Sequence, residues 1–401
     1  MDLPQYTNLL EALAGVPDPR KARGKQHDWR IMLTLLCGAV VSGHKSVRAI
    51  AQWVREHATE LTQQLEPAKQ HLRLPSASTL YRAVRAIDVQ ILENQLACYS
   101  QGIESLRQQE HQESSRRGRR GRRGRRDQLL GQSIDGKEIR GARAHGCPTH
   151  LVSLVRHDSG TVLKQRAVKH KSNEIKAVPY LLEGQDLRGT VTTMDALLTQ
   201  RAIAQQIVNG SGHYLMVVKG NQPELCLSIA ELFACPPWLA SETQANYRHY
   251  SKVEKGHGRL EKRTLESSPA LRECLSEYLH WPGGEQVLRR TCRRVSMKTG
   301  EVSEKVTYGV TSLGWEAADA REIERLWRGH WTIENRVHYV RDVTMGEDAN
   351  QMRSGNAPQV LAALRNSIIN LIRRKGWTNI ADGLRHYGAY VHRALALVTS
   401  P

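Results

Sequence analysis

Apolar side chains recur three and four positions apart through residues 1–107, a spacing that predicts amphipathic helices. One helix is expected to begin at Ser46. Another is expected to follow Pro75, with Ser76 or Ser78 as its N-cap. The pattern fits a helix-turn-helix arrangement and a plain helical bundle about equally well. Residues 1–107 are therefore expected to form an all-helical segment.

The pattern changes to strands after residue 128. Apolar, strand-like runs end at Asp135 and at Asp195. Between them, Asp158-Ser-Gly160 indicates the turn of a hairpin formed by two further runs, 150–156 and 161–168. Helical stretches separate the later strands, and the apolar run 360–372 reads as a core helix. The order of strand, hairpin, helix, strand, helix, strand and helix predicts an α/β fold, a mixed sheet with helices on its faces.

Residues 326–342 predict one helix with chemically different faces. At about 100° per residue, one narrow arc is apolar and is expected to be buried. It holds Leu326, Ile333, Val337 and Val340. A flanking arc mixes indoles with ionisable groups, namely Trp327, His330, Trp331, Glu334, His338, Arg341 and Asp342. Such an arc is either a solvated face with ion pairs or part of a chemical site.

Charge narrows the choice of partner. The net charge is +18. Subtracting the eight arginines between Arg116 and Arg126 leaves +10, which is spread over the rest of the chain. This balance favours a polyanion, with nucleic acid first and an anionic membrane second. No apolar run reaches transmembrane length, so no membrane partner is expected. Seven cysteines without a CxxC pair favour a reducing interior.

Asp135 and Asp195, which end two predicted strands, are best interpreted together with Glu334 on the predicted helix 326–342. Open α/β sheets place their chemistry at the C-terminal ends of strands, although a single Asp there is more often a turn or cap residue. Asp135, Asp195 and Glu334 together form a set of hard oxygen ligands that suits Mg²⁺. Two ions ~3.5–4 Å apart can activate an attacking oxygen and stabilise a leaving one in phosphoryl displacement. The sequence thus predicts a two-Mg²⁺ site, with Mn²⁺ as a substitute.

Short motifs along almost the whole chain support this reading. They are Asp18-Pro-Arg20, Arg23-Gly-Lys25, Ala49-Ile-Ala-Gln-Trp53, Pro75-Ser76, Asp135-Gly-Lys-Glu-Ile-Arg-Gly141, Lys171-Ser-Asn-Glu-Ile175, Met194-Asp-Ala196, Lys219-Gly-Asn-Gln222, Gly256-His-Gly-Arg259, His330-Trp-Thr-Ile-Glu-Asn335 and Gly346-Glu-Asp348. Each motif alone is weak, but together they resemble the DDE insertion-sequence transposases of the ISAs type, which include the H-repeat-associated proteins.

The resemblance implies a ribonuclease H-like catalytic domain with the triad Asp135, Asp195 and Glu334. The expected plan is a helical N-terminal domain as a candidate for binding DNA ends (1–107), an Arg/Gly-rich linker (108–127), a catalytic domain in two segments (128–222 and 316–376), a β-rich insertion (223–315) and a C-terminal tail (377–401). The wider family's Tyr, Arg, Glu and Lys signature reads Trp327, His330, Glu334 and Arg341 here.

Several further residues are candidates for contacting DNA. They are Lys137, Arg140, Lys219, Asn221, Gln222, His257, Arg259, His330 and Arg341, together with Arg116, Arg117, Arg119 and Arg120 of the basic tract. For each, the alternative is an ordinary surface charge or turn residue. His338, one helical turn after Glu334, is expected to orient that carboxylate.

The function expected from the resemblance is metal-dependent cleavage and strand transfer at the ends of an insertion sequence. The partner would be double-stranded DNA, both element ends and target, and a homodimer or larger assembly would form on it. A cytoplasmic, nucleoid-associated location follows. The alternatives are a nuclease on the same fold and a catalytically silent DNA-binding relic or regulator.

Overall fold

The computed structural model describes residues 6–23, 25–68, 72–118, 129–144, 147–168, 174–236 and 246–400, without the side chains of 111–118, 143–144 and 147–148. The chain forms two compact units. Unit 1 holds residues 1–127, 136–173 and 333–401, and unit 2 holds residues 128–135 and 174–332. Each unit is discontinuous in sequence, and the unit boundaries differ from those of the expected domains.

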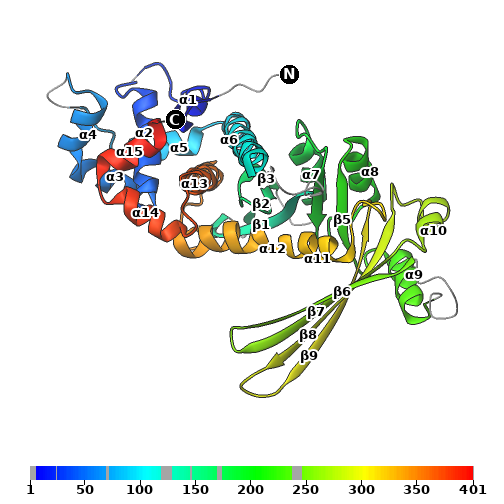
Figure 1. The fold of residues 1–401 in the computed structure, drawn as a ribbon. Coiled ribbons are helices and arrows are strands. Elements are labelled where there is room, and N and C mark those ends of the chain that lie inside the picture. Colours follow the sequence, from blue (N-terminus) through cyan, green and yellow to red (C-terminus); the bar gives the residue numbers. More distant parts are fainter. Residues whose placement is uncertain are drawn as a thin grey trace. The chain divides into compact units, whose positions relative to one another are not determined.

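Unit 1 is built mainly from helices, of which the first run from blue to cyan and the last from orange-brown to red in Figure 1. Their bounds are α1 (Leu9–Ala14), α2 (Trp29–Val41), α3 (Val47–Glu56), α4 (Ala58–Leu65), α5 (Ala77–Ala86), α6 (Val89–Gly118), α13 (Ala357–Arg374), α14 (Ile380–Gly388) and α15 (Val391–Thr399). Helix α3 begins beside the expected Ser46, whose side chain accepts a hydrogen bond from the Ala49 amide. Of the two N-caps expected for α5, Ser76 takes the role and accepts a hydrogen bond from the Thr79 amide.

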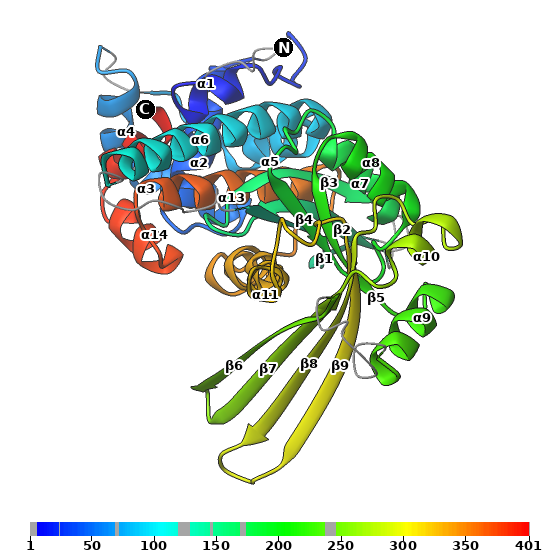
Figure 2. The same cartoon turned by 45° about the vertical axis from the view of Figure 1, so that its right-hand side comes forward.

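Residues 377–401, expected as a C-terminal tail, contain two helices that pack into a core. Helices α14 and α15 supply Leu384, Val391, Leu395 and Val398 to the same buried core as α1, α2 and α3. Their apolar residues recur at helical spacing, and the hydrophobic effect places that face against the N-terminal helices. Figures 1 and 2 both show the first and last helices of the chain side by side.

The first residues of the expected linker, from 108 onward, continue a helix. Helix α6 continues to Gly118, because residues 108–117 are rich in Gln, Glu and Arg, which tolerate a helix well. The Gly-spaced part of the basic tract begins only at Gly118. Arg119 and Arg120 lie outside the described residues, as do the side chains of Arg116 and Arg117, so their expected DNA contacts stay predictions.

The strands form one mixed sheet in the order β3-β2-β1-β4-β5-β9-β8-β7-β6. The first five strands are β1 (Leu130–Ala144), β2 (Cys147–Arg156), β3 (Val162–Val168), β4 (Thr190–Met194) and β5 (His213–Val218). Strands β2 and β3 form the expected hairpin, while β1, β4 and β5 run parallel. Unit 2 contains β1 up to Asp135, and unit 1 contains it from Gly136.

In unit 2, helices α7 (Glu174–Leu182) and α8 (Arg201–Asn209) alternate with β4 and β5, as the sequence predicts. The segment 223–315 contains α9 (Pro223–Ala234), β6 (Arg248–Gly256), β7 (Arg259–Ser268), α10 (Arg272–Glu277), β8 (Gln286–Ser296) and β9 (Val302–Thr311). These four antiparallel strands extend the sheet, because β9 pairs directly with β5. Figure 2 shows them as a long four-stranded ribbon.

The helix expected at 326–342 is present but changes its pitch. Helices α11 (Ala320–Gly329) and α12 (Trp331–Ile333) lead into two π-helical turns, η4 (Glu334–His338) and η5 (Val340–Thr344). The predicted apolar arc is confirmed, with Leu326, Ile333, Val337 and Val340 all buried. The mixed arc is only partly solvated, since Trp327, His338 and Arg341 are buried as well.

Candidate active site

Asp135 and Asp195 lie at equivalent places on two neighbouring strands. Strands β1 and β4 are parallel, and their last paired residues are Ile134 and Met194. Asp135 and Asp195 are the next residues along each strand. Residues that lie opposite each other on paired strands project to the same face of the sheet, and the strands are ~4.8 Å apart. The two carboxylates therefore share one face. The Asp195 carboxylate also accepts a hydrogen bond from the Leu198 amide at 3.1 Å.

The start of the helix that carries Glu334 is bonded to that same face within unit 2. Ser133 Oγ donates to the His330 carbonyl at 3.2 Å, and Thr193 Oγ1 lies 3.0 Å from His330 Nδ1. Ser133 and Thr193 each precede a strand-end acid by two residues, so they project to the acids' face. His330, expected to contact DNA, instead uses its ring to fix the helix on β4.

Glu334 lies one turn after His330 and is paired with His338. His338 Nδ1 is 2.9 Å from Glu334 Oε2, while the Glu334 side chain remains half exposed and His338 is buried. The hydrogen bond from His338 lowers the pKa of the Glu334 carboxyl against the opposing effect of burial, and the Lys137 charge adds to the lowering. Glu334 is therefore ionised near neutral pH, as a metal ligand must be.

The donor set suits a divalent cation. Within unit 1, the Glu334 carboxylate and the His338 ring supply an oxygen and a nitrogen donor 2.9 Å apart. In the described part of the chain, His338 Nε2 is buried and makes no hydrogen bond. Carboxylate oxygens are the ligands that Mg²⁺ and Mn²⁺ prefer, and imidazole is acceptable to transition metals.

Lys137 does not present a free cation to DNA, contrary to expectation. Its side chain is only 7% exposed, and its Nζ lies 2.6 Å from Asp342 Oδ1 and 3.4 Å from Asp348 Oδ1. The ammonium therefore serves an internal ion cluster beside the Glu334 helix. Its neighbour Arg140 is different, because 76% of that side chain is exposed. Arg140 stays a candidate for contacting DNA.

Arg341 is the largest departure from the expected site. The sequence places it on the solvated arc as a phosphate contact, but its side chain is completely buried and pairs with Glu347 at 2.5 Å. The Glu347 carboxylate is itself buried and also pairs with Arg365 at 3.1 Å. A guanidinium enclosed in this way cannot reach a DNA backbone. The DNA-contact assignment of Arg341 is therefore wrong for this structure.

Asn221 and Gln222 support the loop around Asp195. Asn221 Nδ2 donates to the Ala196 carbonyl at 2.5 Å, and Gln222 Nε2 donates to the Thr199 carbonyl at 3.0 Å. Both amides are thus used to hold the chain after β4, which departs from their expected DNA contacts. Lys219, just before them, is exposed.

The candidates in the ribbon are accessible. His257 occupies the β6–β7 turn with φ of 50°, a left-handed conformation, and is exposed. Arg259 follows it, is about half exposed and lies 3.5 Å from Glu261. Neither position conflicts with a DNA contact, and both assignments stay predictions.

Three residues of this region escaped the sequence reasoning. The sequence singles out Glu347 and Asp348 only as part of a motif, and Arg365 only as a member of the apolar run 360–372. A charged residue in the middle of the run 360–372 is costly to bury unless it is paired, and that was the available signal. Its partner, Glu347, lies too far away in sequence for spacing to identify it.

Family comparisons agree over most of the chain. The model described as "Transposase DDE domain" matches residues 103–371, and the model described as "DDE_Tnp_1-associated" matches residues 10–100.

Among the described residues, no helix is both long and apolar enough to traverse a bilayer.

Similar proteins span nearly the same length. The candidate transposase YncI of Escherichia coli O157:H7 is 29% identical over 91% of this chain and 87% of its own. The H repeat-associated candidate transposase YhhI of Escherichia coli K12 is 27% identical over 92% of this chain and 91% of its own. A piggyBac transposase in a synaptic complex with hairpin DNA aligns with a TM-score of 0.43 and 9% identity, over 98% of this chain and 76% of that one.

Proposed function

Since the chain belongs to the DDE transposase family and is an insertion-sequence transposase, we propose that it cleaves DNA at its element's ends and joins them to target DNA. The proposed catalytic residues are Asp135, Asp195 and Glu334 on a ribonuclease H-like core. The strand arrangement β3-β2-β1-β4-β5, with a helix bearing the third acid, supports that core.

One observation carries the proposal. Two acids follow the paired residues Ile134 and Met194 on parallel strands, and the helix bearing the third acid is bonded to that face through His330. This arrangement supports a shared site for three carboxylates that are distant in sequence. A chance cluster of surface acids would not need backbone pairing and side-chain bonds to hold it.

The proposed site holds two Mg²⁺ ions, with Mn²⁺ as a substitute. When bound, the ions supply activation of the attacking oxygen and stabilisation of the leaving oxygen. Asp135, Asp195 and Glu334 would hold them. His338 keeps the Glu334 carboxylate oriented and charged through its Nδ1 hydrogen bond.

We infer that DNA is bound by exposed basic residues rather than by the buried ones. Arg140, Lys219, His257 and Arg259 are accessible, and the chain's net charge of +18 favours phosphate binding generally. Joining two element ends to one target brings two active sites together, so a dimer or larger assembly is proposed on DNA. The helical N-terminal segment remains the candidate for end recognition.

The test uses labelled linear DNA carrying the element's own ends, incubated with the protein in Mg²⁺ or EDTA. Asp135→Asn, Asp195→Asn and Glu334→Gln are compared with Asp186→Asn, which changes an exposed aspartate of unit 2 paired only locally with Arg188. We expect Mg²⁺-dependent cleavage and joining, lost in the first three variants and kept in the fourth, with DNA binding unchanged throughout.

The products discriminate among the possible functions. Cleavage without joined product would indicate a nuclease on this fold. Binding without cleavage by the native chain, in Mg²⁺ and in Mn²⁺, would indicate a silent DNA-binding relic or regulator and would overturn the proposal.

A further inference from the structure

A buried ion cluster in unit 1 follows the Glu334 segment. The side chains of Arg341, Glu347 and Arg365 are 0%, 1% and 4% exposed. Removing three charges from water is costly, and apolar side chains of similar volume often serve stability as well or better. The cluster therefore needs an explanation other than stability alone.

Glu347 uses both carboxylate oxygens to join two elements. Its Oε2 lies 2.5 Å from Arg341 Nη2 on η5, and its Oε1 lies 3.1 Å from Arg365 Nη1 on α13. The Glu347 amide also donates to the Arg341 carbonyl at 2.9 Å. The end of the π-helical segment is thus held to α13 through a single carboxylate.

The cluster reaches a third element, the loop between α2 and α3. Arg365 Nη2 donates to the Lys45 carbonyl at 3.1 Å, and Asn350 Nδ2 donates to the same carbonyl at 2.8 Å. Gly346 has a φ of 61°, and a Cβ there would stand 2.7 Å from Lys45 Cδ. The two hydrogen bonds to the Lys45 carbonyl fix this loop beside Glu347, and the Lys45 side chain lies against Gly346.

A second set of ion pairs, made by Lys137 on β1, holds the same segment. Asp342 follows Arg341, Asp348 follows Glu347, and Lys137 Nζ contacts both carboxylates. Glu334 begins the first π-helical turn, η4, and the restrained residues Arg341 and Asp342 lie in the second, η5. π-helical turns are rare and frequently occur at functional sites. The ion pairs of Glu347 and Lys137 would hold these turns in one conformation.

We propose that Glu347, held between Arg341 and Arg365, is a positioning residue that fixes the π-helical segment and so sets the place of the Glu334 carboxylate. This inference rests on the proposed function, in which Glu334 is a metal ligand. Glu347 itself does not touch the reacting atoms. Its loss therefore acts through metal binding rather than through DNA binding.

The first variant is Arg341→Met/Glu347→Leu/Arg365→Met, which removes all three charges at similar volume. If the cluster served stability alone, replacing its three charges by apolar side chains of similar volume would leave function intact. We expect this variant to melt at or above the native temperature and to bind DNA normally. Its Mn²⁺ affinity, measured directly by calorimetry without DNA, and its cleavage rate should both fall about tenfold or more, as for other residues that support metal ligands.

The second variant, Glu347→Asp, keeps the charge and shortens the tether, so folding is retained even if the triple substitution fails. We expect it to need several times more Mg²⁺ for half-maximal cleavage and to bind Mn²⁺ more weakly. The control is Asp382→Ala, which breaks an exposed ion pair with Arg385 in the same unit and should change neither quantity.

The outcomes separate the two proposals. Native Mn²⁺ affinity and a native Mg²⁺ titration in Glu347→Asp, alongside a dead Glu334→Gln variant, overturn the positioning role alone. Full cleavage by Glu334→Gln overturns the proposed function, and the positioning role with it.

Discussion

At the scale of single residues, burial decides which side chains of the Glu334 segment serve chemistry and which support it. His338 is 3% exposed and its Nδ1 lies 2.9 Å from Glu334 Oε2, whereas the Glu334 side chain is 52% exposed. A buried donor behind an exposed carboxylate orients that carboxylate and keeps it charged. The sequence indicated this pairing correctly, because residues four apart on a helix face each other.

His338→Ala should lower the single-turnover cleavage rate by roughly 10- to 100-fold, because Glu334 loses the hydrogen bond that orients it. His338→Asn, whose amide can replace the Nδ1 donor, should recover part of that loss. Gel-shift measurements on both variants should give native DNA affinity. A variant that binds DNA poorly but cleaves bound DNA at the native rate would contradict the orienting role.

Lys137 and Arg140, two basic neighbours with the same sequence-based expectation, should behave in opposite ways. Lys137→Met leaves Asp342 and Asp348 without their shared cation and should lower the free energy of unfolding by roughly 1 to 3 kcal/mol. Arg140→Ala should leave stability unchanged, weaken DNA binding and reduce the slope of log affinity against log salt by about 1. Denaturant unfolding and salt titrations of binding check both. Equal stability of the two variants would refute the distinction.

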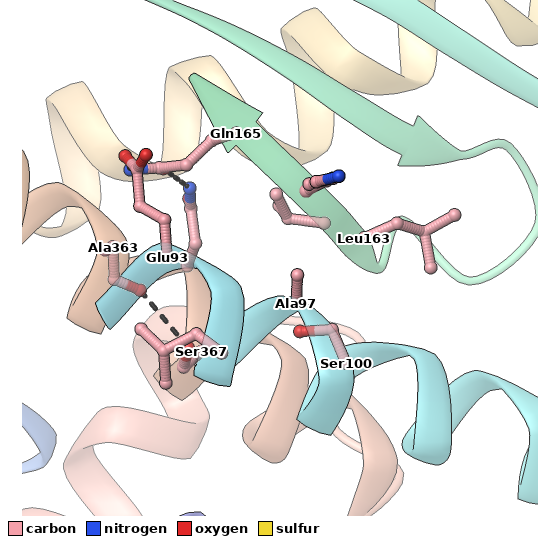
Figure 3. Close-up of a pocket in the computed structure, with 11 residues that line it drawn as sticks. Glu93, Ala97, Ser100, Leu163, Gln165, Ala363 and Ser367 are labelled. Carbon is pink, nitrogen blue, oxygen red and sulfur yellow. Dashed lines mark hydrogen bonds between the residues drawn. The ribbon is translucent and has the colours of Figure 1, made fainter. Parts of the chain in front are cut away.

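At the scale of elements, a buried polar chain joins α6, β3 and α13. Gln165 Nε2 donates to Glu93 Oε1 at 2.8 Å, and Asn366 Nδ2 donates to Gln165 Oε1 at 2.6 Å. These residues border a cavity of about 20 Å³, enough for one water, shown in Figure 3. Burial raises the pKa of Glu93 to about 7, although Gln165 and the Arg166 charge oppose the rise.

This raised pKa gives stability a definite pH dependence. The folded chain holds the Glu93 proton more tightly than the unfolded chain does. The associated stability is therefore complete below the ordinary pKa of 4.5 and is lost as the pH rises through about 7. Glu93→Gln removes this loss and should raise stability by about 3 kcal/mol at pH 8 relative to native, with little effect at pH 4.5.

Thermal unfolding between pH 4.5 and 8 measures the effect. Glu110→Gln, an exposed position on the same helix, should follow the native profile throughout. A Glu93→Gln stability change that is the same at both ends of the range would show that Glu93 does not titrate there.

Local patterns predicted most elements because periodicity depends on neighbours in sequence. The amphipathic helices, the hairpin at Asp158-Ser-Gly160 and the strands ending at Asp135 and Asp195 follow from it. The π-helical turns did not, since residues 334–344 fit an α-helix equally well over so short a length. The burial of Lys137 and Arg341 also depends on Asp348 and Glu347, which reach them only through the fold.

At the scale of the whole molecule, the last helices complete the core of the first. Helix α15 packs on α1, α2 and α4, and α14 packs on α2 and α13. Sequence order conceals this arrangement, because more than 300 residues separate α2 from α15. The amphipathic pattern of 380–399 predicts helices, but it carries no information about which helices cover the apolar face.

Truncation after Gly376 should therefore unfold the N-terminal helices. It removes the buried side chains of Ile380, Leu384, Val391, Leu395, Leu397 and Val398, each worth roughly 1.5–3 kcal/mol when fully buried. Their sum, on the order of 10 kcal/mol, matches the whole stability of a typical domain. Hydrogen exchange should show lost protection in α1 to α3 while β4 and β5 of unit 2 stay protected. Tyr390→Ala, which removes an exposed side chain from the same region, should keep the native pattern. Full protection of α2 in the truncated chain would mean that residues 377–401 are, after all, a dispensable tail.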